Sequence, residues 1–331
     1  MVLEHLTNCK VLSTVRQSED LEGWKAVRTR GIGGSDVGAI CGVHKYATPR
    51  TVYLKKTGQY EEDFDDASKE RMYWGHVLEP LVADEFQRRT GKKVVESPAT
   101  LVHKDHAWAI ANVDRFIVDD NGVPYGILEC KTASSYMEED WEEGNVPLYY
   151  LYQLRWYMWI TGLKYGAIAC LVGGNKYFYF EIYEDEEVTK SIVETCSHFW
   201  NHYVQNLIEP PLTGNDVDSD LVSSKYQDVV KNSEKTLDDE ESDQLASKVL
   251  ALKKQIKVLE EQLDEAKNQL MEKLQETEIG YTVNHIIKWS PRQQTRVDTD
   301  RLKTEYPDIY NKVKKVTKYR VFSVKSLGVD D

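Results

Sequence analysis

Long apolar runs are absent from this sequence of 331 residues. No stretch approaches the roughly 20 apolar residues that a membrane-spanning helix needs. The opening residues, MVLEHLTNCKVL, also lack the basic segment and the apolar core of a signal peptide. We therefore expect a soluble, intracellular protein with no membrane partner.

Cysteine is scarce as well. The five cysteines are scattered and odd in number, and no CxxC pair or Cys/His cluster occurs. This spacing excludes a disulfide scaffold, a zinc module and an iron–sulfur site. Hydrophobic residues make up 41% of the chain and charged residues 29%, which permits a sizeable core and excludes global disorder. The length fits one large domain or two smaller ones.

Positive charge is in deficit, since the formal net charge is -13. Taken alone, this charge argues against nucleic acid as a partner. The deficit is uneven, however, because residues 281–325 contain 11 Lys and Arg against 4 Asp and Glu. The acidity therefore weakens the hypothesis of DNA binding without excluding it.

Changes in composition predict four segments. Residues 1–210 mix helical and strand patterns and carry most of the aromatic side chains. Pro210-Pro211 ends this region, and residues 211–240 are polar enough to form a linker. Residues 241–279 are expected to form a helical arm or coiled coil, and residues 280–331 a small basic module with helix and strand.

The arm is predicted from a heptad repeat. Its apolar residues alternate by four and three along one helical face: Leu245, Val249, Leu252, Ile256, Leu259, Leu263, Ala266 and Leu270. Gly280 is the expected end of this helix. In the module that follows, YTVNHIIKW and YRVFSVK alternate like strands around a helix capped by Asp298 or Thr299.

Residues 101–133 contain the pattern with the most chemical information. Two alternating apolar runs are separated by Asp120-Asn121-Gly122, and Asn-Gly is a strong signal for a hairpin turn. The first strand carries Asp114, and the second carries Glu129, Cys130 and Lys131. Because side chains alternate along a strand, Glu129 and Lys131 should share one face while Cys130 points to the other.

Two acids on paired strands beside a lysine predict a site for a divalent cation. Mg²⁺ prefers hard oxygen ligands, which Asp114, Glu129 and the backbone carbonyl of Cys130 could supply. Lys131 would then orient or deprotonate a water, or hold a scissile phosphate. The same pattern also fits a surface salt bridge on a hairpin, and on its own it does not decide between the two.

Two flanking helices favour the catalytic interpretation. ERMYWGHVLEPLVADEFQRRTG predicts an amphipathic helix ending at Gly91, with a buried side formed by Tyr73, Val77, Pro80 or Leu81, and Phe86. Glu79 lies on it beside apolar Leu78, where an unpaired carboxylate would be costly. The aromatic helix VPLYYLYQLRWYMWITG contains Gln153 as one of its few polar residues. Gln153 either belongs to the site or is an amide that is hydrogen-bonded within the core.

A glycine-rich turn near the N-terminus adds a candidate phosphate site. Gly31, Gly33 and Gly34 precede a predicted helix whose expected N-cap is Ser35, and helix N-termini favour phosphate. Arg28 lies close by in sequence and could clamp a phosphate. The turn matches neither the Walker nor the dinucleotide fingerprint, so an ordinary capped turn remains open.

Together these residues resemble a known family, the YqaJ-type viral recombinases, which are phage alkaline exonucleases related to lambda exonuclease. The resemblance covers roughly residues 20–205. It is carried, in order, by Trp24, Arg28, Ile32 to Asp36, YLKKTG at 53–58, Gly75, Glu79-Pro80, Asp114, Glu129, Lys131 and Gln153. The stretches RVDTDRLKTEYPDIY and RVFSVK also resemble the C-terminal extension of many phage members.

The resemblance implies a PD-(D/E)xK, restriction-endonuclease-like α/β core, with a central mixed sheet flanked by helices, over the nuclease domain 1–210. It implies a 5′→3′ exonuclease on linear duplex DNA that depends on Mg²⁺, for which Mn²⁺ would substitute. It further implies a trimeric ring, a single-strand DNA annealing protein as partner, and a phage or prophage gene expressed in a bacterial cytoplasm.

The resemblance also assigns roles to residues. Asp114, Glu129 and the Cys130 carbonyl match the metal ligands, and Lys131 matches the catalytic lysine. The supporting helix residues of the family correspond to Glu79 and Gln153, and its pocket for the 5′-phosphate corresponds to Arg28 and Ser35. The proline that precedes the aspartate in the PD-(D/E)xK motif is replaced by Val113 in this chain.

Three alternatives remain open from the sequence. The same catalytic core could serve a structure- or sequence-selective endonuclease, in which Arg28 and Ser35 would be dispensable. A second alternative is a protein that has the nuclease fold and binds DNA ends without cutting them. The presence of a suitable residue at every catalytic position argues against it. A helical scaffold would explain the heptads but would give the Glu-x-Lys hairpin no role.

Overall fold

The computed structural model describes residues 2–15, 19–60, 65–142, 144–317 and 319–327. It divides into two compact units, Met1–Val222 and Ser223–Asp331. No helix in the described ranges is long and apolar enough to cross a membrane.

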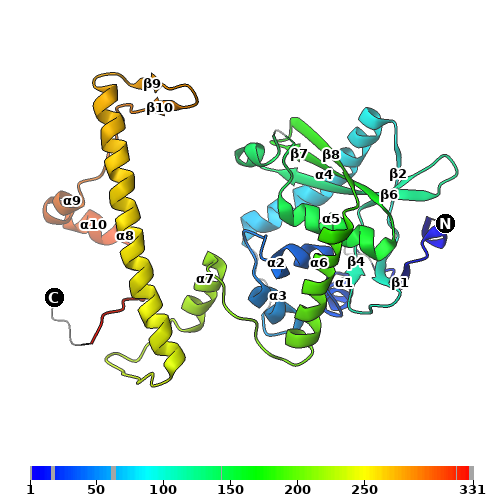
Figure 1. Ribbon diagram of the computed structural model, residues 1–331, viewed down its shortest axis with the longest axis horizontal. Helices are drawn as coiled ribbons and strands as arrows, with labels where there is room; N and C mark the ends of the chain where they lie inside the picture. Colours follow the sequence, from blue (N-terminus) through cyan, green and yellow to red (C-terminus); the bar gives the residue numbers. More distant parts are fainter. Residues whose placement is uncertain (1, 16–18, 61–64, 143, 318, 328–331) are drawn as a thin grey trace. The chain divides into compact units, whose positions relative to one another are not determined.

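A five-stranded mixed sheet forms the centre of the first unit (Figure 1). Its strands, in spatial order, are β2 (Lys93–Glu96), β5 (Arg115–Val118), β6 (Pro124–Ala133), β7 (Tyr165–Val172) and β8 (Lys176–Tyr183). The pair β6–β7 is parallel because helix α5 crosses over between them, and the other pairs are antiparallel. The predicted hairpin is confirmed, with Gly122 at φ 79° in its turn.

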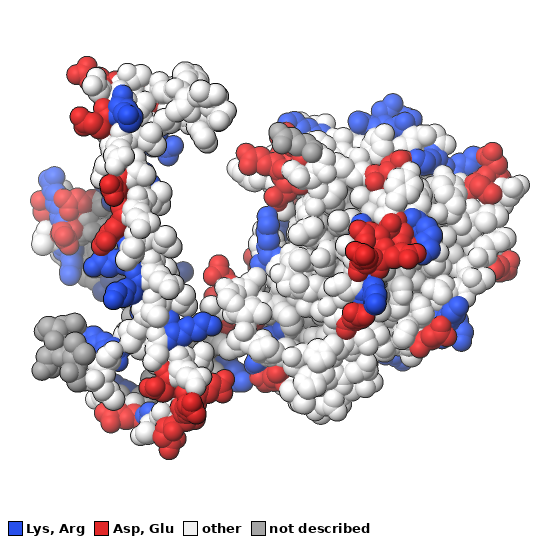
Figure 2. All heavy atoms as spheres, in the orientation of Figure 1, with Lys and Arg blue, Asp and Glu red and all other residues white. Residues whose placement is uncertain are grey.

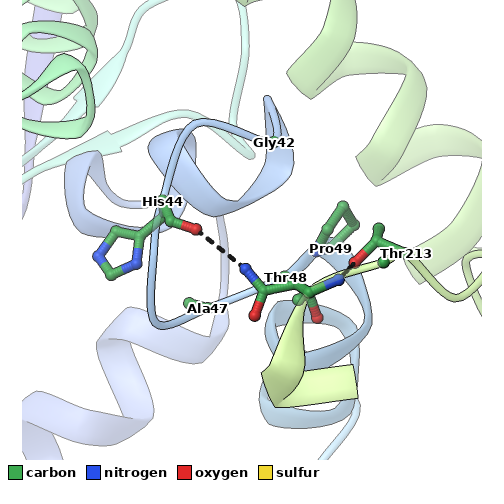
Figure 3. Close-up of a pocket in the computed structure, with 8 residues that line it drawn as sticks. Gly42, His44, Ala47, Thr48, Pro49 and Thr213 are labelled. Atoms are coloured by element: carbon green, nitrogen blue, oxygen red, sulfur yellow. Dashed lines mark hydrogen bonds between the residues drawn. The ribbon is translucent and has the colours of Figure 1, made fainter. Parts of the chain in front are cut away.

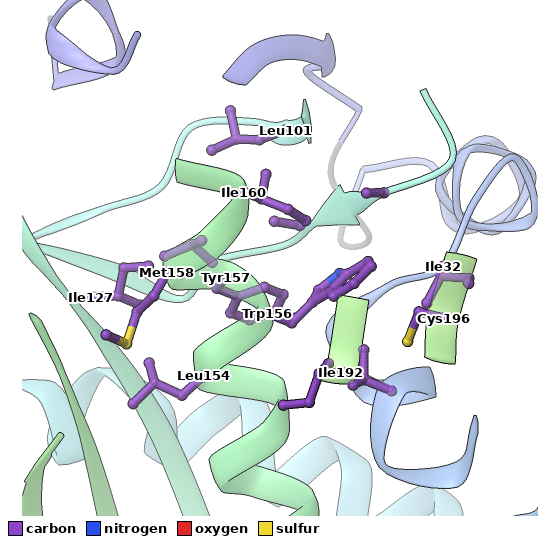
Figure 4. Close-up of a cluster of buried hydrophobic side chains, with 14 of the residues drawn as sticks. Ile32, Leu101, Ile127, Leu154, Trp156, Tyr157, Met158, Ile160, Ile192 and Cys196 are labelled. Atoms are coloured by element: carbon purple, nitrogen blue, oxygen red, sulfur yellow. The ribbon is translucent and has the colours of Figure 1, made fainter. Parts of the chain in front are cut away.

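Each face of this sheet is covered by a different helix. Val82, Ala83 and Phe86 of α4 (Asp66–Thr90) pack against one face. Leu154 and Met158 of α5 (Leu148–Thr161) pack against the other, beside α6 (Glu186–His198), as Figure 4 shows. Layers of helix, mixed sheet and helix bear out the expected α/β class.

A smaller sheet and short helices complete this unit. The sheet has the order β1 (Cys9–Ser13), β3 (Thr100–His103) and β4 (Ile110–Ala111). The helices are α1 (Leu21–Thr29), α2 (Gly34–Ile40), α3 (Pro49–Lys56) and most of α7 (Asp216–Lys225). Shorter turns are the 3-10 helices η1 (Val2–His5) and η2 (Ser135–Asp140) and the π-helical η3 (Phe199–Val204).

The predicted helix around Glu79 exists, but its buried side differs from the expectation. Gly91 ends α4 in the left-handed conformation, as predicted, and Phe86 is fully buried. Tyr73, Val77 and Leu81, however, are 61%, 42% and 58% exposed, and Pro80 is exposed too. Only the C-terminal part of α4 packs on the sheet, so the apolar residues of its N-terminal part are left uncovered.

The segment after Pro210-Pro211 packs on the first unit. Asp218 is 1% exposed and accepts hydrogen bonds from the Thr48 hydroxyl at 2.6 Å and the Thr213 N–H at 2.6 Å. Asn215 donates to the carbonyl of His44, beside a pocket that Thr48 and Thr213 line (Figure 3). These buried polar contacts extend the first unit to Val222, beyond the boundary expected at residue 210.

The second unit consists of the long helix α8 (Glu240–Leu274), the hairpin β9 (Ile279–Tyr281) and β10 (Ile286–Lys288), and the helices α9 (Thr299–Glu305) and α10 (Pro307–Val313). Asp298 caps α9, as expected. Gly280 does not end the arm, because α8 stops at Leu274 and Gln275 turns the chain at φ 50°.

The strand predictions in this unit were partly wrong. YTVNHIIKW does not form one strand: it contains the last residue of β9, Tyr281, then a turn at Thr282–His285, and then β10. The described residues of YRVFSVK form no strand. Alternation alone does not specify a strand when no neighbouring strand supplies hydrogen bonds.

Candidate active site

The hairpin brings Asp114 and Glu129 to the same face of the sheet. Asp114 immediately precedes β5, and Phe116 pairs with Ile127 in the core under α5, so Asp114 and Glu129 lie on that side too. The Oδ2 atom of Asp114 accepts a hydrogen bond of 2.9 Å from the backbone N–H of Cys130. The thiol of Cys130 points to the opposite face, toward α4, as predicted.

Glu129 is more buried than Asp114 or Glu79, with 1% of its surface exposed. Its Oε1 accepts hydrogen bonds from Lys131, at 2.5 Å, and from the side-chain amide of Gln153 on α5. Its Oε2 is buried, with no hydrogen-bond partner among the described residues. Burial and the nearby Asp114 raise the pKa of Glu129 to about 8, although Lys131 opposes that shift.

Lys131 shares the face of Glu129, as predicted, and its Nζ lies 4.8 Å from the ring centroid of Tyr150. Burial would lower the pKa of Lys131. Glu129 and Asp114 outweigh burial, so the net shift of this pKa is upward. The amine is therefore a buried, charged donor held against a carboxylate.

Glu79 reaches the same region from α4. Arg115 donates to Oε1 of Glu79 at 2.6 Å and to the backbone carbonyl of Asp114 at 2.8 Å. Burial and the charge of Asp114 raise the pKa of Glu79, although Arg115 opposes this. Arg115 therefore ties the helix carboxylate to the strand that carries Asp114.

The carboxylates suit a hard cation. In the described part of the chain, no three His, Cys, Asp or Glu side chains are already arranged around a common point for a metal ion. The residues nevertheless fit one, because the Oε2 atom of Glu129 is buried without a partner and Asp114 raises the pKa of both Glu79 and Glu129. A cation would neutralise that repulsion, and carboxylate oxygens are the ligands that Mg²⁺ prefers.

The glycine-rich turn begins α2 differently from the expectation. Gly33, not Ser35, is the N-cap, and the carboxylate of Asp36 accepts a hydrogen bond of 2.8 Å from the Gly33 N–H. Because Asp36 takes the capping role, the hydroxyl of Ser35 is left to contact Arg28, whose guanidinium donates to it at 2.5 Å. The ring of Trp24 lies 4.6 Å from the same guanidinium.

Close packing joins this turn to the carboxylate site. A Cβ built on Gly34 would lie 2.5 Å from the ring of Tyr157 and 2.8 Å from the side chain of Gln153, so this position excludes any larger residue. Tyr157 also accepts a hydrogen bond of 3.3 Å from the Gln153 amide. The turn that positions Arg28 therefore packs directly on the side chain that binds Glu129.

A buried ion pair between Lys56 and Asp36 stabilises the glycine-rich turn. Lys56 of α3 lies 2.7 Å from Asp36, with side-chain exposures of 6% and 12%, and it also donates to the backbone carbonyl of Arg28 at 2.8 Å. Burial alone would raise the pKa of Asp36, but Lys56 and Arg28 outweigh it and lower the pKa. One lysine thus connects α1, α2 and α3.

We expect Lys56→Met to lower the free energy of unfolding by about 3 kcal/mol, because it leaves Asp36 as a buried charge without its partner. Chemical denaturation followed by circular dichroism measures this. Lys45→Met is the matched control, since Lys45 pairs with Asp140 at side-chain exposures of 57% and 37%. Equal losses in the two variants would contradict the role given to the buried pair.

The structure brings the sequence-predicted residues into two connected groups. Asp114, Glu129 and Lys131 share the face under α5, and Gln153 of α5 donates to Glu129. Glu79 is linked to them through Arg115, and Arg28 contacts Ser35. Sequence reasoning gave no role to four contributors, namely Asp36, Lys56, Arg115 and Tyr157. Two of them lie inside the motifs that carried the resemblance, and Tyr157 lies one helical turn after Gln153.

Comparison with known proteins gives the family. The model of the YqaJ-like viral recombinase domain matches residues 23–164. The protein YqaJ of Bacillus subtilis (strain 168) is 36% identical over 307 residues, which cover 92% of this chain and 94% of YqaJ.

Solved structures of exonucleases are also similar. The alkaline exonuclease LHK-Exo of Laribacter hongkongensis is 21% identical, with a TM-score of 0.48 over 57% of this chain and 94% of that one. A phage-related exonuclease of Haemophilus somnus 129PT is 12% identical, with a TM-score of 0.41 over 56% of this chain and 98% of that one. By its identity to YqaJ over nearly its whole length, the chain belongs to the YqaJ-like viral recombinase family.

Proposed function

We propose that the protein is a Mg²⁺-dependent 5′→3′ exonuclease that digests linear double-stranded DNA from 5′-phosphorylated ends. One observation carries the proposal: a buried Glu129 has a free oxygen beside Asp114 and a charged lysine on the same face. Membership of the YqaJ-like viral recombinase family supports the same chemistry.

The residues divide the work of phosphodiester hydrolysis. Asp114, Glu129 and the backbone carbonyl of Cys130 would hold Mg²⁺, and Mn²⁺ would substitute. Such a cation, when bound, lowers the pKa of a water molecule and offsets charge on the phosphate. Lys131 positions the attacking water or donates to the phosphate, while Gln153 keeps the Glu129 carboxylate aligned. Arg115 holds Glu79 at the edge of the site.

Arg28 and Ser35 would select the DNA end. The guanidinium is fixed by the Ser35 hydroxyl and by the ring of Trp24, so its remaining donors are preorganised for a terminal phosphate. Figure 2 shows Lys and Arg side chains and Asp and Glu side chains scattered among uncharged residues on the face that is drawn.

The biological setting follows from the family. We infer a trimeric ring that encircles the duplex, a single-strand DNA annealing protein as partner in recombination, and a phage or prophage gene expressed in the cytoplasm of a bacterial host. The decisive experiment incubates linear duplex DNA bearing 5′-phosphates, and a covalently closed circle, with the protein and Mg²⁺ or EDTA. Loss of the linear DNA alone, only with Mg²⁺, supports the exonuclease, whereas cutting of the circle indicates an endonuclease.

Arg28→Ala is expected to reduce digestion of 5′-phosphorylated ends by about 10- to 100-fold, on the order of a lost hydrogen bond to a charged group, and to leave 5′-hydroxyl ends unaffected. Initial rates on two duplexes that differ only in the terminal phosphate measure this. Arg30→Ala is the matched control, because Arg30 is the exposed C-cap of the same helix. An equal loss on both duplexes would show that Arg28 does not read the phosphate.

A further inference from the structure

The long helix α8 exposes an apolar stripe. In the 35 residues of α8, Leu274 is the buried one, while Leu252, Ile256, Leu259 and Leu263 are 45%, 53%, 63% and 55% exposed. The neighbouring charged and amide side chains of α8 are exposed as well. A row of large apolar residues on a helix this long indicates a surface that another helix covers.

The spacing specifies what kind of helix fits. The stripe alternates by four and three over nearly four heptads, which places Val249, Ile256, Leu263 and Leu270 at positions a, and Leu245, Leu252, Leu259 and Ala266 at positions d. This repeat of 3.5 residues keeps the stripe facing one partner when two helices supercoil. A surface that binds a peptide without a heptad repeat would not require this spacing of 3.5 residues.

The charges beside the stripe select a second copy in antiparallel orientation. Lys253, Glu260 and Lys267 occupy positions e, and Lys248 occupies position g. In a parallel pair of identical helices, Lys248 of one copy would face Lys253 of the other, which is repulsive. In the antiparallel pair, Lys253 of each copy faces Glu260 of the other, so two attractive pairs replace the repulsion.

All eight apolar residues match in that orientation. When Ile256 of one copy faces Leu259 of the other, the same register places Leu252 opposite Leu263. It also places Val249 opposite Ala266 and Leu245 opposite Leu270. No polar residue then falls in the apolar layers. Gln255 faces Gln262 beside them, which is a neutral pairing.

We propose that α8 pairs with α8 of a second copy of this chain as an antiparallel coiled coil in this register. The contact is twofold symmetric, because each surface contacts its own equivalent. It is proposed in addition to the trimeric ring, and it does not depend on catalysis. Helix α8 would thus dimerise the protein through its second unit.

Cysteine cross-linking of the full chain tests orientation and register. Leu252→Cys and Leu263→Cys proteins are prepared separately, mixed, and oxidised with copper phenanthroline. The mixture is expected to form a covalent dimer, whereas each variant alone should not, because its two cysteines would lie roughly 16 Å apart along the pair. A mixture of Leu252→Cys and Leu270→Cys, displaced by one heptad, is the out-of-register control. The unsubstituted chain, with partly exposed Cys9 and Cys41, gives the background.

Two results would overturn the proposal. Cross-linking of Leu252→Cys alone would show a parallel pair. No cross-link in any mixture, with the arm still helical by circular dichroism, would show that the stripe is covered by something else, such as the annealing partner. Because these readouts need no DNA, the pairing and the exonuclease proposal fail independently.

A charge exchange gives a second, independent measurement. Lys253→Glu should weaken the antiparallel pair about tenfold, since two attractive contacts become repulsive. The double variant Lys253→Glu/Glu260→Lys should restore it. In a parallel pair the single variant would instead strengthen association, because the introduced carboxylate would face Lys248. Sedimentation equilibrium of the full chain distinguishes these outcomes.

Discussion

Replacement of Lys131 by methionine is expected to reduce digestion of linear duplex DNA by about 10³-fold, within the range for loss of a group that positions or transfers a proton. The amine lies 2.5 Å from Glu129, and the side chain of Lys131 is only 17% exposed. Methionine keeps the length and apolar stem of the side chain and removes only the charge and the donors. Initial rates of nucleotide release with Mg²⁺ measure the loss.

The variant should remain folded, which makes the result interpretable. Without Lys131, Glu129 can take up a proton, because burial and Asp114 already raise its pKa to about 8. Lys176→Met is the matched control, since Lys176 on β8 also pairs with a glutamate, Glu138, but is 52% exposed. Lys131→Met with activity within about tenfold of the unsubstituted protein would remove Lys131 from the mechanism.

The central part of the site could be predicted because short-range rules determine it. Side chains alternate along a strand, which places Glu129 and Lys131 on one face of β6. The Asn-Gly turn then pairs β5, which follows Asp114, with β6. Both rules need only neighbouring residues. The mixed sheet with helices on both faces was expected only from the family resemblance, and the structure confirms it.

The remaining features depend on long-range packing. The apolar residues of α4 predict a buried side, but only the neighbours decide that Phe86 is covered while Tyr73 is not. The sequence suggests Ser35 as the N-cap, yet Gly33 is the N-cap, and its N–H donates to Asp36, whose carboxylate Lys56 of another helix holds in place. Likewise, Arg115 reaches Glu79 only after α4 packs beside β5.

The metal site can be tested without DNA. A cation that binds the folded state stabilises it by RT ln(1 + [L]/Kd), so about 10 mM Mg²⁺ with a dissociation constant of about 1 mM should add roughly 1.4 kcal/mol. For a unit of this size that gain corresponds to a rise in Tm of about 3–5 °C over the value in EDTA. Thermal melting with and without Mg²⁺ measures it.

Asp114→Asn is expected to abolish this rise in Tm. The asparagine carbonyl can still accept the hydrogen bond from the Cys130 N–H, so the hairpin is preserved. In EDTA the variant should be at least as stable as the unsubstituted protein, because the charge that raises the pKa of Glu129 is gone. Asp120→Asn is the matched control and should keep the full rise, since Asp120 is an exposed residue of the hairpin turn that pairs with Lys93. If Asp114→Asn keeps the rise as well, the cation binds elsewhere, and the roles assigned to Asp114 and Glu129 as its ligands are wrong.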